Sequence, residues 1–83
     1  MDKKIAVITG ASSGIGKYLS IILSEKFHIF LIARNSEKLQ KIADLITSRK
    51  NSCTIIKADI SKLEDIKIIE DRLKDLNIDI LIN

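Results

Sequence analysis

All glycines of this 83-residue chain lie in one short segment, Thr9-Gly10-Ala11-Ser12-Ser13-Gly14-Ile15-Gly16. Glycine has no Cβ, so the chain can turn sharply and its backbone N–H groups can approach an anion closely. A helix that begins at such a turn adds the partial positive charge of its N-terminus. The segment therefore predicts a phosphate-binding loop. Gly10 makes the turn, Gly14 lies where the backbone approaches the ligand, and Gly16 lets the helix pack near the sheet.

The glycine spacing is a weak signal by itself, and its surroundings make it specific. Residues 4–9 form an apolar run, which predicts a strand buried on both faces. Residues 14–25 carry apolar side chains at spacings of three and four, which predicts a helix. Its buried stripe is expected to be Ile15, Tyr18, Leu19, Ile22 and Leu23. A strand, a glycine turn and a helix together form the unit that holds the pyrophosphate of a dinucleotide. The alternative is a glycine-rich turn that binds nothing.

The rest of the chain continues the alternation of strand and helix. After the first strand and helix, the predicted elements are a strand at 27–33, a helix at 36–49, a strand at 53–58, a helix to about 76 and a strand from 79. Ser61 and Glu64 form a capping-box pattern before the third helix. The inward residues are expected to be Leu39, Ile42, Ala43 and Ile46 on the second helix, and Leu63, Ile66, Ile69, Leu73 and Leu76 on the third.

Helical connections between strands imply a parallel sheet. Right-handed crossovers with one reversal give the strand order 3-2-1-4 in an α/β, Rossmann-like, three-layer fold. A doubly wound fold of this kind binds ligands at its switch point, here the carboxyl ends of the first and fourth strands.

The composition excludes several classes of protein. A hydrophobic share of 46% and a charged share of 30% indicate a folded chain of a single domain. The net charge of +3 is spread along the sequence without interleaved aromatic residues, so we expect no nucleic-acid partner. One cysteine, Cys53, and one histidine, His28, cannot form a disulfide or a zinc site, and His28 is expected to have a packing or surface role. We see neither a secretion signal nor a stretch of membrane-spanning length, so we expect a cytoplasmic protein that binds no membrane.

The tip of the second predicted strand indicates which dinucleotide binds. In a Rossmann fold this position faces the adenosine ribose, and an acid there hydrogen-bonds the free ribose hydroxyls. This chain has Arg34 instead, whose guanidinium can form two hydrogen bonds to a 2′-phosphate. The hydroxyl of Ser13 and the amide of Asn35 are expected nearby. These residues favour NADP(H) over NAD(H), the alternative being that Arg34 is a solvated surface residue.

The glycine segment resembles the cofactor motif of the classical short-chain dehydrogenases/reductases, and the similarity extends over the whole chain. The other similar segments are Ala33-Arg34-Asn35-Ser36-Glu37-Lys38-Leu39, Ala58-Asp59-Ile60-Ser61 and Asp79-Ile80-Leu81-Ile82-Asn83. The last of these resembles the strand that leads into the family's Asn-Asn-Ala-Gly motif. The resemblance implies that residues 1–83 are the N-terminal part of a single NAD(P)-binding Rossmann domain.

The resemblance also implies a set of cofactor-binding residues. They are Gly10, Ser12, Ser13, Gly14, Ile15, Gly16, Arg34, Asn35, Asp59, Ile60 and Asn83. The Asp59 carboxylate and the Ile60 backbone would hold the adenine, and Asn83 would lie near a cofactor ribose. The alternative for Asp59 is that it only starts a turn and helps to cap the following helix.

The family performs hydride transfer between the nicotinamide and a small carbonyl or alcohol substrate with a Tyr-x-x-x-Lys motif. The one tyrosine of this chain is Tyr18, and position 22 is isoleucine, so we expect no catalytic residue within it. We expect the chain to be a fragment that lacks the catalytic half, from a protein that forms homo-oligomers. The alternatives are a non-catalytic NAD(P)-binding module and a truncated product without function.

Overall fold

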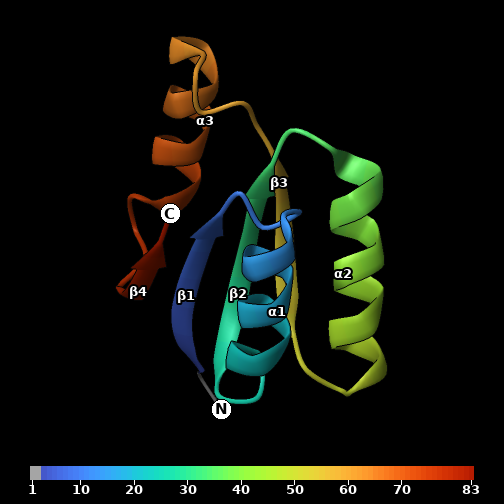
Figure 1. Cartoon of the computed structure of the whole chain (residues 1–83). Helices are drawn as coiled ribbons and strands as arrows, with labels where there is room; N and C mark the ends of the chain where they lie inside the picture. Colours follow the sequence, from blue (N-terminus) through green and yellow to red (C-terminus); the bar gives the residue numbers. More distant parts are fainter. Residues whose placement is uncertain (1–2) are drawn as a thin grey trace.

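The fold is an alternation of strands and helices, described here for residues 3–83 by a computed structural model (Figure 1). The elements are β1 (Lys4–Thr9), α1 (Gly14–Leu23), β2 (Phe27–Ala33), α2 (Ser36–Ser48), β3 (Cys53–Lys57), α3 (Leu63–Leu73) and β4 (Ile78–Ile82). The predicted order of elements is therefore confirmed. The ends differ by a few residues, most of all for α3, which stops at Leu73.

The four strands form one parallel sheet in the order β3-β2-β1-β4, as predicted. The helices α1 and α2 cover one face, and α3 packs on the other (Figure 1). The chain therefore has the three-layer, Rossmann-like arrangement. Its switch point falls between β1 and β4, whose carboxyl ends lie at the same edge of the sheet. Among the helices of the described chain, none combines the length and apolar character that crossing a membrane requires.

The core is built from the alternation of side chains along the central strands. Ala6 and Ile8 of β1 pack into the cluster under α1 and α2, whereas Val7 packs on the α3 side. On α2, the predicted stripe of Leu39, Ile42, Ala43 and Ile46 is buried. The prediction succeeded there because one continuous apolar stripe meets one sheet face.

The predicted buried stripe of α1 is wrong in part, since Leu19 is half-buried and Leu23 packs against the core, but its other three residues are exposed. Ile15, Tyr18 and Ile22 are 77%, 66% and 50% exposed, and the fully buried positions of the helix are Gly16 and Ser20. The Ser20 hydroxyl donates a 2.7 Å hydrogen bond to the carbonyl of Gly16, so this polar group is satisfied within the helix. Gly16 faces inward because α1 approaches the Gly10–Ala11 turn too closely there for a side chain.

The predicted start and inward face of α3 are wrong in part. The N-cap is Lys62, without a side-chain cap, and the Ser61 hydroxyl hydrogen-bonds Asp59 instead of forming a capping box. Leu63 and Ile66 are exposed. The other three residues of the expected stripe, Ile69, Leu73 and Leu76, are partly buried against the sheet. The C-terminal half of α3 and the turn after it therefore hold the helix against the sheet. The side chains of its first turn do not pack there and can contact the preceding loop.

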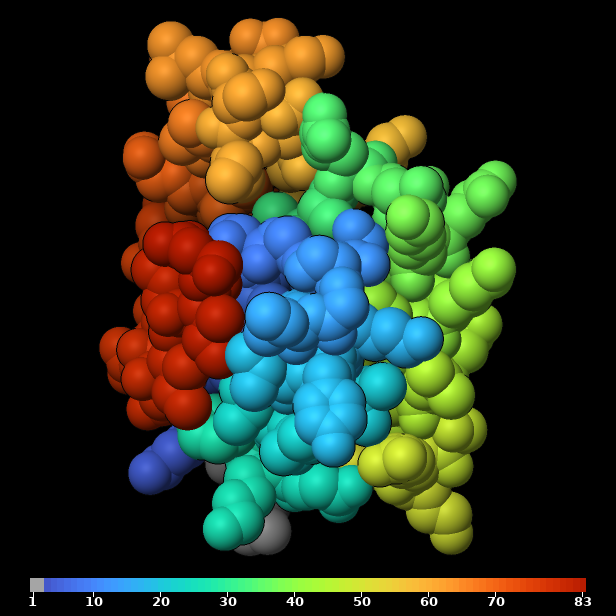
Figure 2. Space-filling model, viewed as in Figure 1, coloured from blue at the N-terminus to red at the C-terminus, as the bar shows by residue number. Residues whose placement is uncertain are grey.

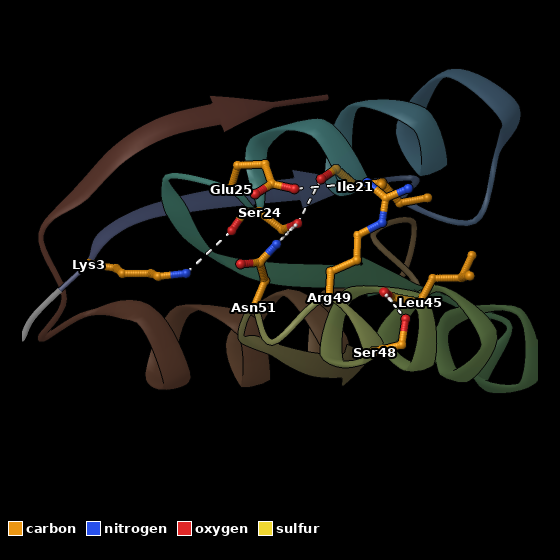
Figure 3. A network of polar contacts seen from close by, with 8 residues as sticks. All are labelled: Lys3, Ile21, Ser24, Glu25, Leu45, Ser48, Arg49 and Asn51. Atoms are coloured by element: carbon orange, nitrogen blue, oxygen red, sulfur yellow. Dashed lines mark hydrogen bonds and ion pairs between the residues drawn. The ribbon is translucent and has the colours of Figure 1, made fainter.

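A polar network fastens the amino end of the sheet, away from the glycine loop (Figure 3). The buried Ser24, after α1, accepts a 3.2 Å hydrogen bond from Asn51, and its carbonyl accepts one of 3.4 Å from Lys3. These bonds join the start of β1 to the ends of α1 and α2. The nearby Arg49–Glu25 pair is 3.9 Å apart and more than half exposed, so it adds little.

His28 belongs to this end of the molecule as well. Its ring nitrogens lie 2.8 Å from the hydroxyls of Ser52 and Thr54, and its ring meets Phe30 edge to face. Burial, with a smaller contribution from the charge of Lys3, lowers the pKa of this imidazole. His28 thus packs at the sheet end opposite the glycine loop, as expected.

Two residues after the end of α2, a non-glycine residue adopts the left-handed backbone conformation. Lys50 has φ of 63°. Its N–H bonds the Thr47 carbonyl at 2.9 Å, and the Asn51 N–H bonds the Ile46 carbonyl at 3.1 Å. This is a Schellman motif, in which glycine is the favoured residue at the position of Lys50.

We expect Lys50→Gly to raise the free energy of unfolding by about 1 kcal/mol, because glycine adopts this backbone conformation without the steric cost of a Cβ. Urea unfolding measures the change, and Lys50→Ala is the matched control, since it removes the same charge and keeps the Cβ. Equal stabilities of the glycine and alanine variants would contradict the prediction.

Candidate functional site

The loop after β1 folds back on itself before α1 begins. Gly10 has φ of +65°, a conformation that strongly favours glycine. The Gly10 carbonyl accepts hydrogen bonds from the Ser13 N–H at 3.1 Å and the Ser13 hydroxyl at 2.9 Å. The N–H of the buried Ala11 donates to the Ile32 carbonyl of β2 at 3.3 Å. The loop is therefore closed within itself and anchored to the neighbouring strand.

The other two glycines differ in what surrounds them. A Cβ on Gly16 would lie 2.5 Å from the Gly10 carbonyl oxygen and 3.1 Å from the Ala11 Cα. Gly16 therefore lets α1 press on the Gly10–Ala11 turn, so the close approach is to this loop, whereas the sequence predicted one to the sheet. A Cβ on Gly14 would have no described protein atom within 4 Å. The space beside Gly14 is open, as a site for a ligand close to the backbone requires.

The start of α1 has the electrostatics of an anion site. Its N-cap is Ser13, whose side chain makes no capping hydrogen bond in the described chain because its hydroxyl is turned to Gly10. The first turn of the helix contains no acidic residue. The positive end of the helix dipole is thus not neutralised by a side chain of that turn, and it can attract a phosphate.

Three turns that follow β1, β2 and β3 surround a hollow of about 690 Å³. In Figure 2 it lies between the blue glycine loop, the green turn after β2 and the orange start of α3. Its size is in the range of small-molecule sites. The predicted site residues that line it are Gly10, Ser12, Ser13, Arg34, Asn35, Asp59 and Ile60. Segments far apart in sequence are therefore brought together as the strand order predicts.

Four predicted site residues do not line this hollow. Gly14 and Gly16 lie at the start of α1, and the Ile15 side chain points outward. Asn83 follows β4, where its side-chain oxygen accepts a 3.0 Å hydrogen bond from the Thr9 hydroxyl. Thr9 also donates to the Ile82 carbonyl at 3.3 Å, so this hydroxyl ties together the ends of β1 and β4 at the switch point.

The hollow also contains a cation that the sequence reasoning missed. Lys38 lines it together with Arg34, and both side chains are exposed. Lys38 lies on the first turn of α2, where its N–H bonds the Asn35 side-chain oxygen at 3.1 Å. Asn35 is thus the N-cap of α2 and has only its amide NH₂ left for a ligand. The sequence could have indicated Lys38, because its neighbour Leu39 belongs to the buried stripe of α2 and so fixes the direction in which the Lys38 side chain projects.

The turn after β3 presents a carboxylate to the same hollow. The Asp59 Oδ1 accepts hydrogen bonds from the Ser61 hydroxyl at 2.7 Å and the Ser61 N–H at 2.9 Å. These two bonds, with smaller contributions from the charges of Arg34 and Lys62, lower the pKa of Asp59. Both bonds end on Oδ1, so Oδ2 is the oxygen that can meet a ligand's amino group. Ser61, which sequence reasoning assigned to a cap, is therefore part of the site.

The described residues contain no group of three or more His, Cys, Asp or Glu side chains that could hold a metal ion. The single thiol, Cys53 at the start of β3, has its pKa raised by burial and by the charge of Asp44. This shift favours the neutral thiol over the reactive thiolate.

Known proteins share both the sequence and the fold. The family model for short chain dehydrogenases matches residues 4–83. The uncharacterized oxidoreductase Lmo0432 of Listeria monocytogenes is 45% identical over 68 residues, which cover 81% of this chain and 27% of that protein. The human inactive hydroxysteroid dehydrogenase-like protein 1 is 43% identical over 81 residues, or 94% of this chain and 24% of that protein. The chain thus spans about a quarter of the length of these relatives.

Solved structures agree with these relatives. A metagenomic short-chain oxidoreductase in complex with NADP superposes with a TM-score of 0.88 at 26% identity, over 98% of this chain and 38% of that one. A protein of Haemophilus influenza assigned as a D-mannonate oxidoreductase, with bound NAD, has a TM-score of 0.83 at 28% identity, over 98% and 30% of the two chains.

We expect Gly16→Ala to destabilise the fold by about 1–3 kcal/mol, because its Cβ would meet backbone atoms that cannot move aside without shifting α1. Gly14→Ala is the matched control, because its Cβ enters open space and alanine favours the helix. Thermal unfolding of both variants checks the pair. Equal losses of stability would show that α1 does not press on the loop as described.

Proposed function

The chain belongs to the short-chain dehydrogenase family, and we propose that it binds the adenosine and pyrophosphate portion of a nicotinamide dinucleotide. The proposal applies to the chain as the N-terminal, cofactor-holding part of an NAD(P)-binding Rossmann domain. Two structural neighbours, one in complex with NADP and one with bound NAD, support the class of ligand.

The observation that carries the proposal is the open space beside Gly14, at the positive end of α1 and next to the hollow. The pyrophosphate would lie against the backbone of Gly14 and Ile15, where N–H groups and the helix dipole favour negative charge. Ser12 would donate a hydrogen bond from its hydroxyl at the same end of the hollow, and Ser13 would do so on exchanging its bond to the Gly10 carbonyl for one to the ligand. Gly10 and Gly16 would act through the loop, by allowing its turn and its closeness to α1.

The adenosine would fill the hollow itself. The Asp59 carboxylate would accept a hydrogen bond from the adenine amino group through its free oxygen, and the Ile60 N–H would donate to a ring nitrogen. Arg34 at the tip of β2 would face the ribose, with the NH₂ of Asn35 beside it. Asn83, held by Thr9 at the switch point, would contact the dinucleotide beyond the hollow.

The charges around the ribose favour NADP(H) over NAD(H). The tip of β2 carries Arg34, and the first turn of α2 adds Lys38 to the lining of the hollow. Both cations would attract a 2′-phosphate, whereas an acid that would hydrogen-bond the free ribose hydroxyls of NAD does not stand at the tip of β2. The acid that does line the hollow, Asp59, comes from β3 instead.

We propose oxidoreductase activity, and we assign it to the whole protein because this chain spans only about a quarter of the length of its relatives. When bound, the nicotinamide would supply or accept the hydride, with a carbonyl or alcohol as substrate. The second candidate is a non-catalytic NAD(P)-binding protein. It is favoured by one relative's being named inactive.

We expect the chain to bind NADP(H) more tightly than NAD(H), and Arg34→Asp to weaken NADP binding roughly 10–100-fold while improving NAD binding. Calorimetric titration with both dinucleotides measures the two affinities. Lys67→Asp on the exposed face of α3 is the control, because it makes the same change of charge outside the hollow. Equal or tighter binding of NAD by the unmodified chain would refute the NADP preference.

A further inference from the structure

The turn that presents Asp59 to the hollow is braced from the following helix by Asp65. The Asp65 Oδ2 accepts a 2.7 Å hydrogen bond from the backbone N–H of Asp59. We propose that Asp65 is a positioning residue for adenine, which sets the direction of the Asp59 carboxylate and the Ile60 N–H without touching the ligand. This inference rests on the proposed dinucleotide binding and adds to it the residue that determines recognition of the base.

The brace completes a set of bonds that fixes Asp59 on several sides. Its N–H is held by Asp65, its carbonyl accepts a 3.0 Å bond from the Lys62 N–H, and its Oδ1 accepts both bonds from Ser61. With these groups engaged, rotation of the Asp59 side chain is restricted, so Oδ2 has a defined direction. Preorganisation of this kind improves binding because less freedom is lost when the ligand arrives.

The Asp65 bond is different from ordinary helix capping. In a capping box, the third residue of the helix reaches back to the N–H of the N-cap itself. Here the third residue of α3, Asp65, bonds the N–H of Asp59, which lies three residues before the N-cap Lys62. The bond therefore spans the whole turn. A helix cap alone would not require it, whereas a turn that must hold a fixed shape would.

Positively charged side chains lie near the two carboxylates of this turn, Asp59 and Asp65. Asp59 and Asp65 line one small hollow together with Arg34, Lys57 and Lys62. Of these cations, Arg34 and Lys62 attract the Asp59 carboxylate and help to lower its pKa, which favours a negative charge at this turn. Arg34 belongs both to this hollow and to the larger one, so the bracing of the turn and the proposed phosphate contact share a cation.

A comparison of purine bases isolates the positioning role. AMP carries the amino group that Asp59 would accept from, whereas IMP carries a carbonyl oxygen there and would repel the carboxylate. We expect the unmodified chain to bind AMP about tenfold or more tightly than IMP, the range expected for one hydrogen bond to a charged group. In Asp65→Ala the turn loses its brace, so AMP should weaken more than IMP and their ratio should fall toward one.

Two further variants complete the test. Asp65→Asn keeps an acceptor oxygen and should retain most of the preference for AMP over IMP. Glu64→Ala removes the neighbouring acid of the same first turn and should leave both affinities unchanged. If Asp65→Ala does not fold, Asp65→Ser, whose hydroxyl is shorter than the carboxylate, provides the same comparison.

Equal weakening of AMP and IMP in Asp65→Ala, or an unchanged ratio, would overturn the positioning role, because a purely structural residue affects both bases alike. Failure of the unmodified chain to bind either AMP or NADP would instead refute the proposed function, and the inference with it. The two failures are distinguishable, since the second is seen before any residue is changed.

Discussion

The closeness of α1 to the turn beneath it determines the geometry of the candidate site. A side chain at position 16 would collide with the Gly10 carbonyl, so the helix begins directly over the loop only because glycine occurs there. This contact aims the N-terminus of α1 at the open space beside Gly14. The Ala11–Ile32 hydrogen bond then fixes the loop to β2, whose end carries Arg34. A single short-range packing constraint thus sets the distance between the proposed phosphate and ribose subsites.

That constraint also explains where sequence reasoning succeeded and failed. The strand order and the α2 face were predictable because they depend on periodicity and on the handedness of crossovers. The α1 face was not, since apolar residues such as Tyr18 lie outside while Gly16 and Ser20 lie inside, and periodicity alone cannot distinguish close packing from exposure. The loop residues were found through the glycine pattern. Ser61 was missed because its role depends on how the turn after β3 folds, whereas the position of Lys38 beside Leu39 in the buried stripe of α2 was a signal left unused.

The site assembles charge from segments that are distant in sequence. Arg34 follows β2, Lys38 lies in the first turn of α2 and Asp59 follows β3, yet they line one hollow because parallel strands end at the same edge of the sheet. At the opposite edge, hydrogen bonds of Ser24 with Asn51 and Lys3 tie the ends of α1 and α2 to the start of β1 (Figure 3). One end of the sheet therefore carries this polar network, and the other end carries the proposed recognition of a dinucleotide.

The proposed function depends on the pyrophosphate's lying against the backbone where α1 begins. An NMR titration of the labelled chain with NADP, in which backbone amide shifts are followed residue by residue, tests this position. We expect the largest changes at Ser12 to Ile15, smaller ones at Arg34 and Ile60, and none around His28. Changes centred on the His28 end of the sheet, or no changes at saturating NADP, would contradict it.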